Sequence, residues 1–357
     1  VATWKDGSME DEIDKAATSV CGILLFKEMK EPRTVSGEIY VGVDLMKLIC
    51  ALLIVFMHTY NHDWGVVGEW IHTTLTPIGV PFFFIVSGFL YGKGLKKTMA
   101  SKEYFSHYVK RIIYMYVFWT MVTLPVAWMN LEIAHADYSV GLKLLYIVRC
   151  FFLTGSIGIY WYLLALIYNS VLIYYAVKWR KESLLYMLAL VFFVVGVLYD
   201  GGLLKGTAVG NVIHVSVGSE RNFLNVGLFY MSIGFLFAQK RFTFPAMVTP
   251  VILALLLVAA TWYNSVSPFR VMQAPLAVLL FMIAMQHAYK YLLPYSLAMR
   301  KWSTAIYLGH FPLILWFDYY LVRGTILDFS LVLIVSLVLF YMLSSICPQR
   351  LLKVIYG

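Results

Sequence analysis

The chain has 357 residues, of which 61% are apolar and only 13% are charged, and its mean hydropathy is +0.77. This composition excludes an ordinary soluble globular domain and predicts a polytopic membrane protein. The formal net charge of +9 does not indicate nucleic-acid binding, because the basic residues fall in short loops between apolar segments. The apolar segments lack the alternation of a transmembrane barrel, so the predicted fold class is all-α.

The four cysteines are Cys21, Cys50, Cys150 and Cys347, which lie far apart in the chain. None of them has a CxxC or Cys/His spacing. We therefore expect neither a disulfide framework nor a metal site.

Three segments follow from the pattern of composition along the chain. Residues 1–40 form an N-terminal leader, either an amphipathic helix or a disordered stretch, and contain no cleavable signal peptide. Residues 41–350 form a ten-helix membrane domain, and residues 351–357 form a short tail. The predicted spans are 43–62, 77–92, 112–130, 159–177, 184–199, 222–238, 245–262, 272–288, 303–320 and 328–347. The segment 142–153 is too short and too interrupted to span, and we expect it to be interfacial or re-entrant.

The distribution of lysine and arginine gives an orientation for this plan. Alternate loops hold fourteen basic residues on one side and six on the other, and the flanks of the first and last spans are also basic. Because basic loops stay in the cytoplasm, both termini should be cytoplasmic in a multi-pass protein of the plasma membrane. The segments Asn61–Pro77 and Asn130–Gly158 would then be outer loops.

The first span carries three ionisable residues, Asp44, Lys47 and His58. Eleven residues separate Lys47 from His58, which amounts to three helical turns plus roughly 20° and a rise of about 16 Å. The three side chains therefore share one stripe of one helix. Ionisable residues inside a span are costly and are candidates for function by default. The alternatives are that Lys47 snorkels to the interface, paired with Asp44, and that His58 is a hydrogen-bonded packing residue.

Five motifs in this order resemble the acyltransferase 3 family of integral membrane O-acyltransferases. They are D44-x-x-K47-x(10)-H58, VPFFFIVSGFLYG (80–92), KRIIYMY (110–116), IYWYLLALIY (159–168) and AIYLGHFPLI (305–314). The resemblance covers about residues 40–350, and ten spans is the number typical of the family. Lysine stands at position 47 where the family more often has arginine, and Tyr108 stands where the family often has a second arginine entering the third span.

The resemblance implies transfer of an acyl group, commonly acetyl, from cytoplasmic acyl-CoA to a hydroxyl of a cell-envelope carbohydrate or related acceptor. His58 matches the catalytic histidine of the family and Lys47 matches its basic partner, while Asp44 would hold Lys47 in place. The candidate acyl-CoA residues are Lys110, Arg111, Ser87 and Gly88, although a positive-inside anchor and small-residue helix packing are alternative roles for them. The candidate acceptor residues are Trp161, Tyr162, Tyr307 and His310, and an interfacial aromatic belt or a tie between helices would also account for these.

Two other functions fit the same polar stripe. A transporter or permease would use it to bind a solute or relay protons, and a non-catalytic membrane sensor would need no catalytic role for it. The acceptor, the acyl length and the oligomeric state are not readable from the sequence.

Overall fold

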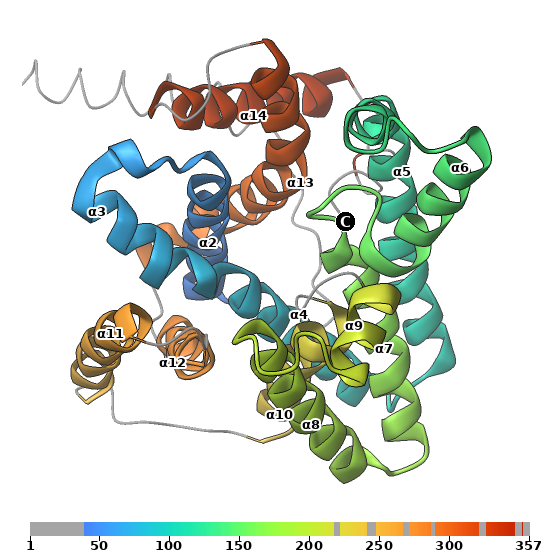
Figure 1. Ribbon diagram of the computed structural model, residues 1–357. Helices are drawn as coiled ribbons and strands as arrows, with labels where there is room; N and C mark the ends of the chain where they lie inside the picture. Colours follow the sequence, from blue (N-terminus) through green and yellow to red (C-terminus); the bar gives the residue numbers. More distant parts are fainter. Residues whose placement is uncertain are drawn as a thin grey trace, which may run out of the picture. The chain divides into compact units, whose positions relative to one another are not determined.

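The computed structural model describes residues 39–217, 222–240, 248–266, 271–286, 290–320, 326–346 and residue 352 (Figure 1). The chain divides into two units, residues 1–37 and 38–357, and every described residue belongs to the second unit. The predicted leader and tail therefore lie outside the described residues, apart from Ile39, Tyr40 and Leu352.

A helix lies at each of the ten places where an apolar span was predicted. In chain order these helices are α2 (Val41–Thr59), α4 (Gly79–Lys97), α5 (Lys102–Ala134), α7 (Trp161–Lys178), α8 (Glu182–Asp200), α10 (Phe229–Gln239), α11 (Thr249–Val266), α12 (Gln273–Gln286), α13 (Ser296–Tyr320) and α14 (Ile326–Ile346). A π-helical turn, η5 (Phe223–Leu228), leads into α10. All regular structure in the described part of the chain is helical, which confirms the all-α class.

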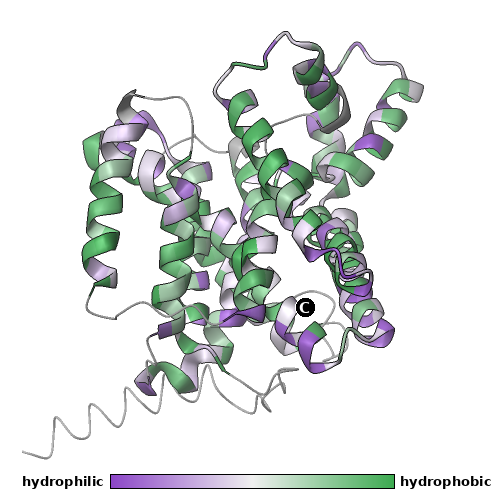
Figure 2. Ribbon diagram, turned by 90° about the horizontal axis from the view of Figure 1, so that it is seen from below, coloured by the Kyte–Doolittle hydropathy of each residue, from purple (hydrophilic) through white to green (hydrophobic). Residues whose placement is uncertain are grey.

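Six helical segments among the described residues are long and apolar enough to cross a membrane. They are Val41–Thr59, His62–Lys97, Lys102–Ala134, Trp161–Lys178, Glu182–Asp200 and Leu327–Ile346. The number rises to seven if Gln273–Gln286 and Lys290–Phe317 are counted as one bent span. Hydrophobic residues dominate the helices (Figure 2), as expected for a multi-pass membrane protein. The predicted count of ten crossings stays a prediction.

The two segments predicted to be outer loops contain more helix than the sequence suggested. Residues 62–78 form η1 (His62–Trp64), α3 (Gly65–Trp70), η2 (Ile71–Leu75) and η3 (Thr76–Ile78), and the second loop contains α6 (Val140–Arg149) and η4 (Cys150–Thr154). A further short helix, α9 (Ala208–Val217), follows α8. The hydroxyls of Thr73 and Thr76 donate to the carbonyls of Glu69 and His72 at 2.9 and 2.7 Å, so both threonines fit within a helix.

Two of the spanning helices begin earlier than predicted. α5 starts at Lys102, where the Ser101 hydroxyl accepts a hydrogen bond from the Tyr104 amide at 3.1 Å. α13 starts at Ser296 rather than at residue 303. Charged residues that the sequence placed in loops therefore lie inside helices, and Arg300 is the most important of them.

The helix α4 packs against α10, α2, α12 and α7. Its approach to α10 depends on two glycines, because a Cβ at Gly88 would overlap the carbonyl of Met231 and one at Gly234 would overlap the carbonyl of Ile85. Small residues that let helix backbones approach closely are typical of membrane helix pairs. The close packing of α4 against α10 therefore explains the glycine at position 88, and no bound ligand is needed to explain it.

Replacing Gly88 by alanine should therefore destabilise the helix pair by about 1–3 kcal/mol, because one of two rigid backbones must move. The midpoint of thermal unfolding in detergent should fall. Gly141→Ala is the control, since a Cβ at Gly141 meets nothing within 4 Å. An equal effect of both substitutions would contradict this account of the α4–α10 contact.

Candidate active site

The helix α2 carries the three polar residues of the first span, and it packs against α13, α4, α12 and α14. Asp44 is 4% exposed, and Lys47 and His58 are half-buried. α2 contacts α13 near both ends of α2, at Asp44 and at His58.

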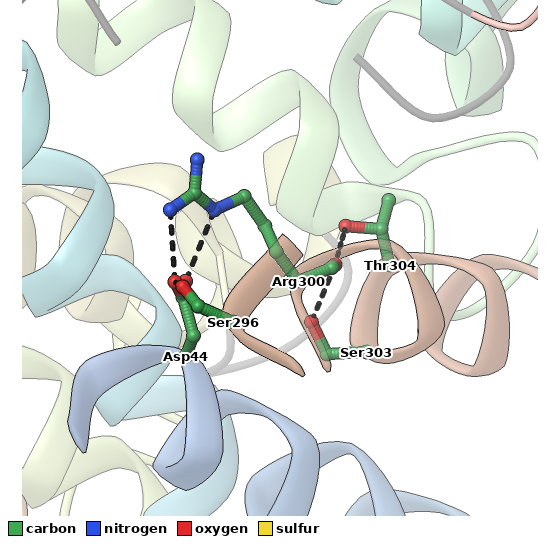
Figure 3. A network of polar contacts seen from close by, with 5 residues as sticks. All are labelled: Asp44, Ser296, Arg300, Ser303 and Thr304. Atoms are coloured by element: carbon green, nitrogen blue, oxygen red, sulfur yellow. Dashed lines mark hydrogen bonds and ion pairs between the residues drawn. The ribbon is translucent and has the colours of Figure 1, made fainter. Parts of the chain in front are cut away.

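At the Asp44 end, the carboxylate is held by two residues of α13 (Figure 3). The Arg300 guanidinium donates to it through Nε at 3.1 Å and Nη2 at 2.8 Å, and the Ser296 hydroxyl donates at 2.6 Å. The third guanidinium nitrogen, Nη1, points away from the carboxylate (Figure 3). A bidentate arginine–carboxylate pair is strong and fixes its geometry, so this contact sets how α2 and α13 meet.

The same contacts assign Asp44 a different partner from the one the sequence indicated. Lys47 lies over the ring of Phe83 on α4, with Nζ 6.0 Å from the ring centroid, and no ion pair joins it to a carboxylate among the described residues. Lys47 interacts electrostatically with Asp44 but also with Arg300 and Arg111. Lys47 therefore interacts with two cations, Arg300 of α13 and Arg111 of α5, and with one carboxylate, which Arg300 already binds.

At the other end of α2, His58 meets two rings of α13. Its centroid is 5.4 Å from that of His310 and 5.1 Å from that of Phe311. His310 is fully buried, and its Nδ1 lies 3.0 and 2.8 Å from the backbone oxygens of Ile306 and Tyr307. Carbonyl oxygens can only accept, so Nδ1 carries the proton and Nε2 presents a lone pair. Among the described residues, nothing donates a hydrogen bond to that Nε2.

Aromatic side chains connect the two ends of this site. The ring of Phe83 lies 5.3 Å from that of Tyr307, which in turn lies 6.1 Å from the ring of His310. Tyr162 packs edge-on to Tyr307 at 5.2 Å, and its hydroxyl lies 2.9 Å from that of Ser87. Residues from α2, α4, α7 and α13 thus form one continuous set of contacts between Lys47 and His58.

A cavity of about 920 Å³ opens at the His58 end. Its wall includes three of the predicted residues, His58, Trp161 and Tyr307. The other predicted residues are not part of the wall: Asp44, Lys47, Ser87, Gly88, Lys110, Arg111, Tyr162 and His310. Lys47 and His58 therefore lie at different levels of α2. His58 is part of the cavity wall and Lys47 is not.

The basic residues near the start of α5 lie on the surface of the protein. Lys110 and Arg111 are both exposed, and the Arg111 guanidinium lies 5.6 Å from the ring centroid of Tyr108. Arg111 reaches the neighbourhood of Lys47, as its electrostatic interaction with that residue indicates.

Sequence reasoning did not identify Arg300, Phe311 and Asn225 as site residues. Arg300 was counted only as a loop charge, and Phe311 stands beside the motif histidine with no signal of its own. Asn225 lines the cavity from η5 and lies inside the predicted span 222–238, where it had no role of its own. Its spacing of three from Asn222, at the start of an apolar segment, is the signal that could have identified it.

Comparison with known families shows to which family the chain belongs. Residues 40–345 match the acyltransferase domain that defines the acyltransferase 3 family. The chain belongs to this family. The match covers all of the described helices except the last residue of α14, Ile346. It does not by itself specify a donor or an acceptor.

Individual relatives match the chain only over part of its length. Two proteins named amino-acid racemase from Enterococcus faecalis are 25% and 22% identical over 203 and 195 residues, and a serine/alanine racemase from Enterococcus gallinarum is 27% identical over 136 residues. These matches cover 56%, 53% and 37% of this chain but only 27%, 27% and 19% of the relatives. The chain thus spans about a quarter of the length of the curated relatives that it matches. No solved structure matches it.

The pair of Asp44 and Arg300 gives a direct test of the α2–α13 contact. Asp44→Asn and Arg300→Gln should each lower the free energy of unfolding by about 1–3 kcal/mol, since each leaves a partly buried charge unpaired. The doubly substituted protein should lose less than the sum, because the same interaction is removed twice. Thermal or denaturant unfolding in detergent measures all four proteins. Strictly additive losses would show that the two side chains do not interact.

Proposed function

We propose that this protein is a membrane O-acyltransferase that moves an acyl group, foremost acetyl, from cytoplasmic acyl-CoA to a hydroxyl of a cell-envelope carbohydrate or related acceptor. The observation that carries the proposal is the position of His58. Its imidazole lines a large cavity on one side and lies against buried His310 on the other.

In the proposed reaction, His58 removes the proton of the acceptor hydroxyl. The hydroxyl oxygen attacks the thioester carbonyl, a carbon–oxygen bond forms, the carbon–sulfur bond breaks, and the CoA thiolate leaves and takes up the proton. A transient acyl-imidazole on His58 is the alternative route to the same products. His310 acts as a positioning residue, because its Nε2 lone pair can accept a hydrogen bond from the protonated His58 ring or from a water held between the two rings.

The Asp44 end of α2 is the proposed binding site for the phosphates of the donor. Lys47 interacts with the positive charges of Arg111 and Arg300 and with the carboxylate of Asp44, and this excess of positive charge favours an anionic ligand. Asp44 and Ser296 orient the Arg300 guanidinium, which compensates for the lysine at position 47 where the family more often has arginine. Lys110 and the hydroxyl of Ser87 are candidates for further contacts with the donor.

The direction of α2 and α13 supports the ten-span plan with both termini in the cytoplasm. Early residues of α2 meet early residues of α13 at Asp44 and Arg300, and late residues meet at His58 and His310. The two helices therefore run in the same direction. Spans one and nine of a ten-span protein would do so, because an odd number of crossings separates them.

A transporter for a small solute is the competing function, and the large cavity is the feature that favours it. A non-catalytic membrane sensor is a third possible function. Under either alternative, acyl transfer is absent from the start or does not change when His58 is replaced. The proposed enzyme, in contrast, depends on that residue.

His58→Ala should abolish transfer or hydrolysis of labelled acetyl-CoA by the purified protein. His310→Phe should lower kcat about tenfold with little change in KM, because a phenyl ring keeps the packing but removes the Nε2 acceptor. Full activity of His58→Ala would contradict the base role. Solute flux unaffected by either substitution, with no acyl transfer by the unsubstituted protein, would favour the transporter.

Arg300→Gln and Lys47→Gln should each raise KM for acetyl-CoA about tenfold, since each removes one charge–phosphate contact. The same variants should not change KM for S-acetylpantetheine, which lacks the nucleotide phosphates. Lys96→Gln is the matched control, because Lys96 is exposed at the end of α4 and the charge change is identical. An equal rise in KM for both thioesters would refute phosphate binding at this end of α2.

A further inference from the structure

We propose that Tyr160 is a positioning residue for the reaction at His58, and that it acts through the turn of α13 that carries His310. Its buried hydroxyl binds a backbone carbonyl that Pro312 leaves without the usual helical partner. This inference rests on the proposed function, because it takes His58 and His310 as the reacting end of α2. It adds a residue that acts on the reaction without lining the cavity.

The proline inside α13 creates the need for a hydrogen-bond donor from outside the helix. Pro312 lies two residues after His310. Because proline has no backbone N–H, it cannot donate to the carbonyl of Leu308, four residues earlier. Proline is tolerated in a membrane helix bundle when a neighbouring element satisfies the freed backbone group. The Tyr160 hydroxyl does so, since it donates to the Leu308 oxygen at 3.3 Å.

A second hydrogen bond joins the same two segments in the opposite direction. The Tyr307 hydroxyl donates to the backbone oxygen of Ile159 at 3.4 Å. Each tyrosine therefore binds the backbone of the residue next to the other tyrosine. Tyr160 and Tyr307 are 0% and 5% exposed, and hydrogen bonds are stronger in such an interior than in water. This reciprocal pair ties the residues just before α7 to the middle of α13.

The turn of α13 held in this way is also the turn that orients His310. Its Nδ1 lies 3.0 and 2.8 Å from the backbone oxygens of Ile306 and Tyr307, so the ring is fixed against the backbone that surrounds Leu308. The same ring lies 5.4 Å from that of His58, centroid to centroid. A shift of this turn would therefore change the contact between the two imidazoles. Reaction rates are sensitive to displacements of this kind.

The position of Tyr160 points to an indirect role in the reaction. Its chain neighbours Ile159 and Trp161 line the cavity, but Tyr160 itself does not. Its hydroxyl also interacts with that of Thr123 on α5, which is 1% exposed. Residues of α5, of α13 and of the segment before α7 thus meet at one buried hydroxyl. Tyr160 can affect a substrate in the cavity only through the residues that it holds.

The first experiment removes the hydroxyl and keeps the ring. Tyr160→Phe should lower kcat for cleavage of labelled acetyl-CoA about tenfold and leave KM unchanged, since the proposed phosphate site lies at the other end of α2. In the protein that carries His310→Phe, the same substitution should lower kcat no further, because Tyr160 acts through His310. Equal losses in both backgrounds, or a rise in KM without a fall in kcat, would overturn the inference.

The second experiment restores the missing donor by another route. Pro312→Ala supplies a backbone N–H for the carbonyl of Leu308, so the Tyr160 hydroxyl is no longer required. In this background Tyr160→Phe should change kcat by less than about twofold. A residue that only stabilises the fold would not be rescued in this way. A loss of about tenfold in the Pro312→Ala protein would contradict the assigned role.

Tyr91→Phe is the matched control. Tyr91 is also 0% exposed, and its hydroxyl donates to the backbone oxygen of Ser170 at 3.1 Å. The residue four positions after Ser170 is Tyr174, whose backbone N–H can serve that carbonyl within α7. Tyr91→Phe should therefore leave kcat unchanged. A loss of kcat as large as that of Tyr160→Phe would refute the special role of Tyr160.

Hydrogen–deuterium exchange separates a failure of this inference from a failure of the proposed function. Tyr160→Phe should speed the exchange of backbone amides in residues 306–316, and Tyr91→Phe should not. Unchanged exchange there would refute the tie between Tyr160 and α13. Faster exchange with unchanged kcat would overturn the positioning role and leave only a structural contact. Absence of any thioester cleavage by the unsubstituted protein would instead refute the proposed acyltransferase reaction itself.

Discussion

The arrangement of this protein depends on the contact between α2 and α13, which is fixed at both ends of α2. At one end Asp44 binds Arg300 through two hydrogen bonds, and at the other His58 lies beside His310. Fourteen residues separate Asp44 from His58, which corresponds to a rise of about 21 Å along the helix. Two polar contacts at that separation set both the rotation and the register of the two helices. Every other side chain of the site is placed relative to this pair.

The ion pair also explains how charged residues are accommodated in so apolar a chain. A buried charge without a partner is costly, because it loses its hydration with no compensating interaction. Asp44 and Arg300 share that cost, and the Ser296 hydroxyl occupies a further acceptor position of the carboxylate. Lys47 receives less compensation, because its described contact is the ring of Phe83 and its nearby charges include two arginines. The excess positive charge at this end of α2 is the physical reason to expect an anionic ligand there.

Much of this architecture could be predicted from the sequence, because apolar length and helical periodicity are local properties. Each predicted span coincides with a helix. The polar stripe of the first span indicated α2, which carries Lys47 and lines the cavity through His58. The partner of Asp44 could not be predicted, since Lys47 is one turn away in sequence whereas Arg300 is 256 residues away. The helical segments after α2 were not predicted, since residues 61–77 were interpreted as an outer loop. The burial of the Asn225 Nδ2 with no hydrogen-bond partner among the described residues is equally a property of packing between α8 and η5, and spacing within one segment does not reveal it.

A cryo-electron microscopy structure with a non-hydrolysable acetyl-CoA analogue would test the central claim most directly. The account predicts phosphate density beside Lys47, Arg111 and Arg300, and the acetyl group at the imidazole of His58 on the edge of the cavity. Phosphates bound inside the cavity, or an acetyl group far from His58, would contradict the division of α2 into a donor end and a reaction end.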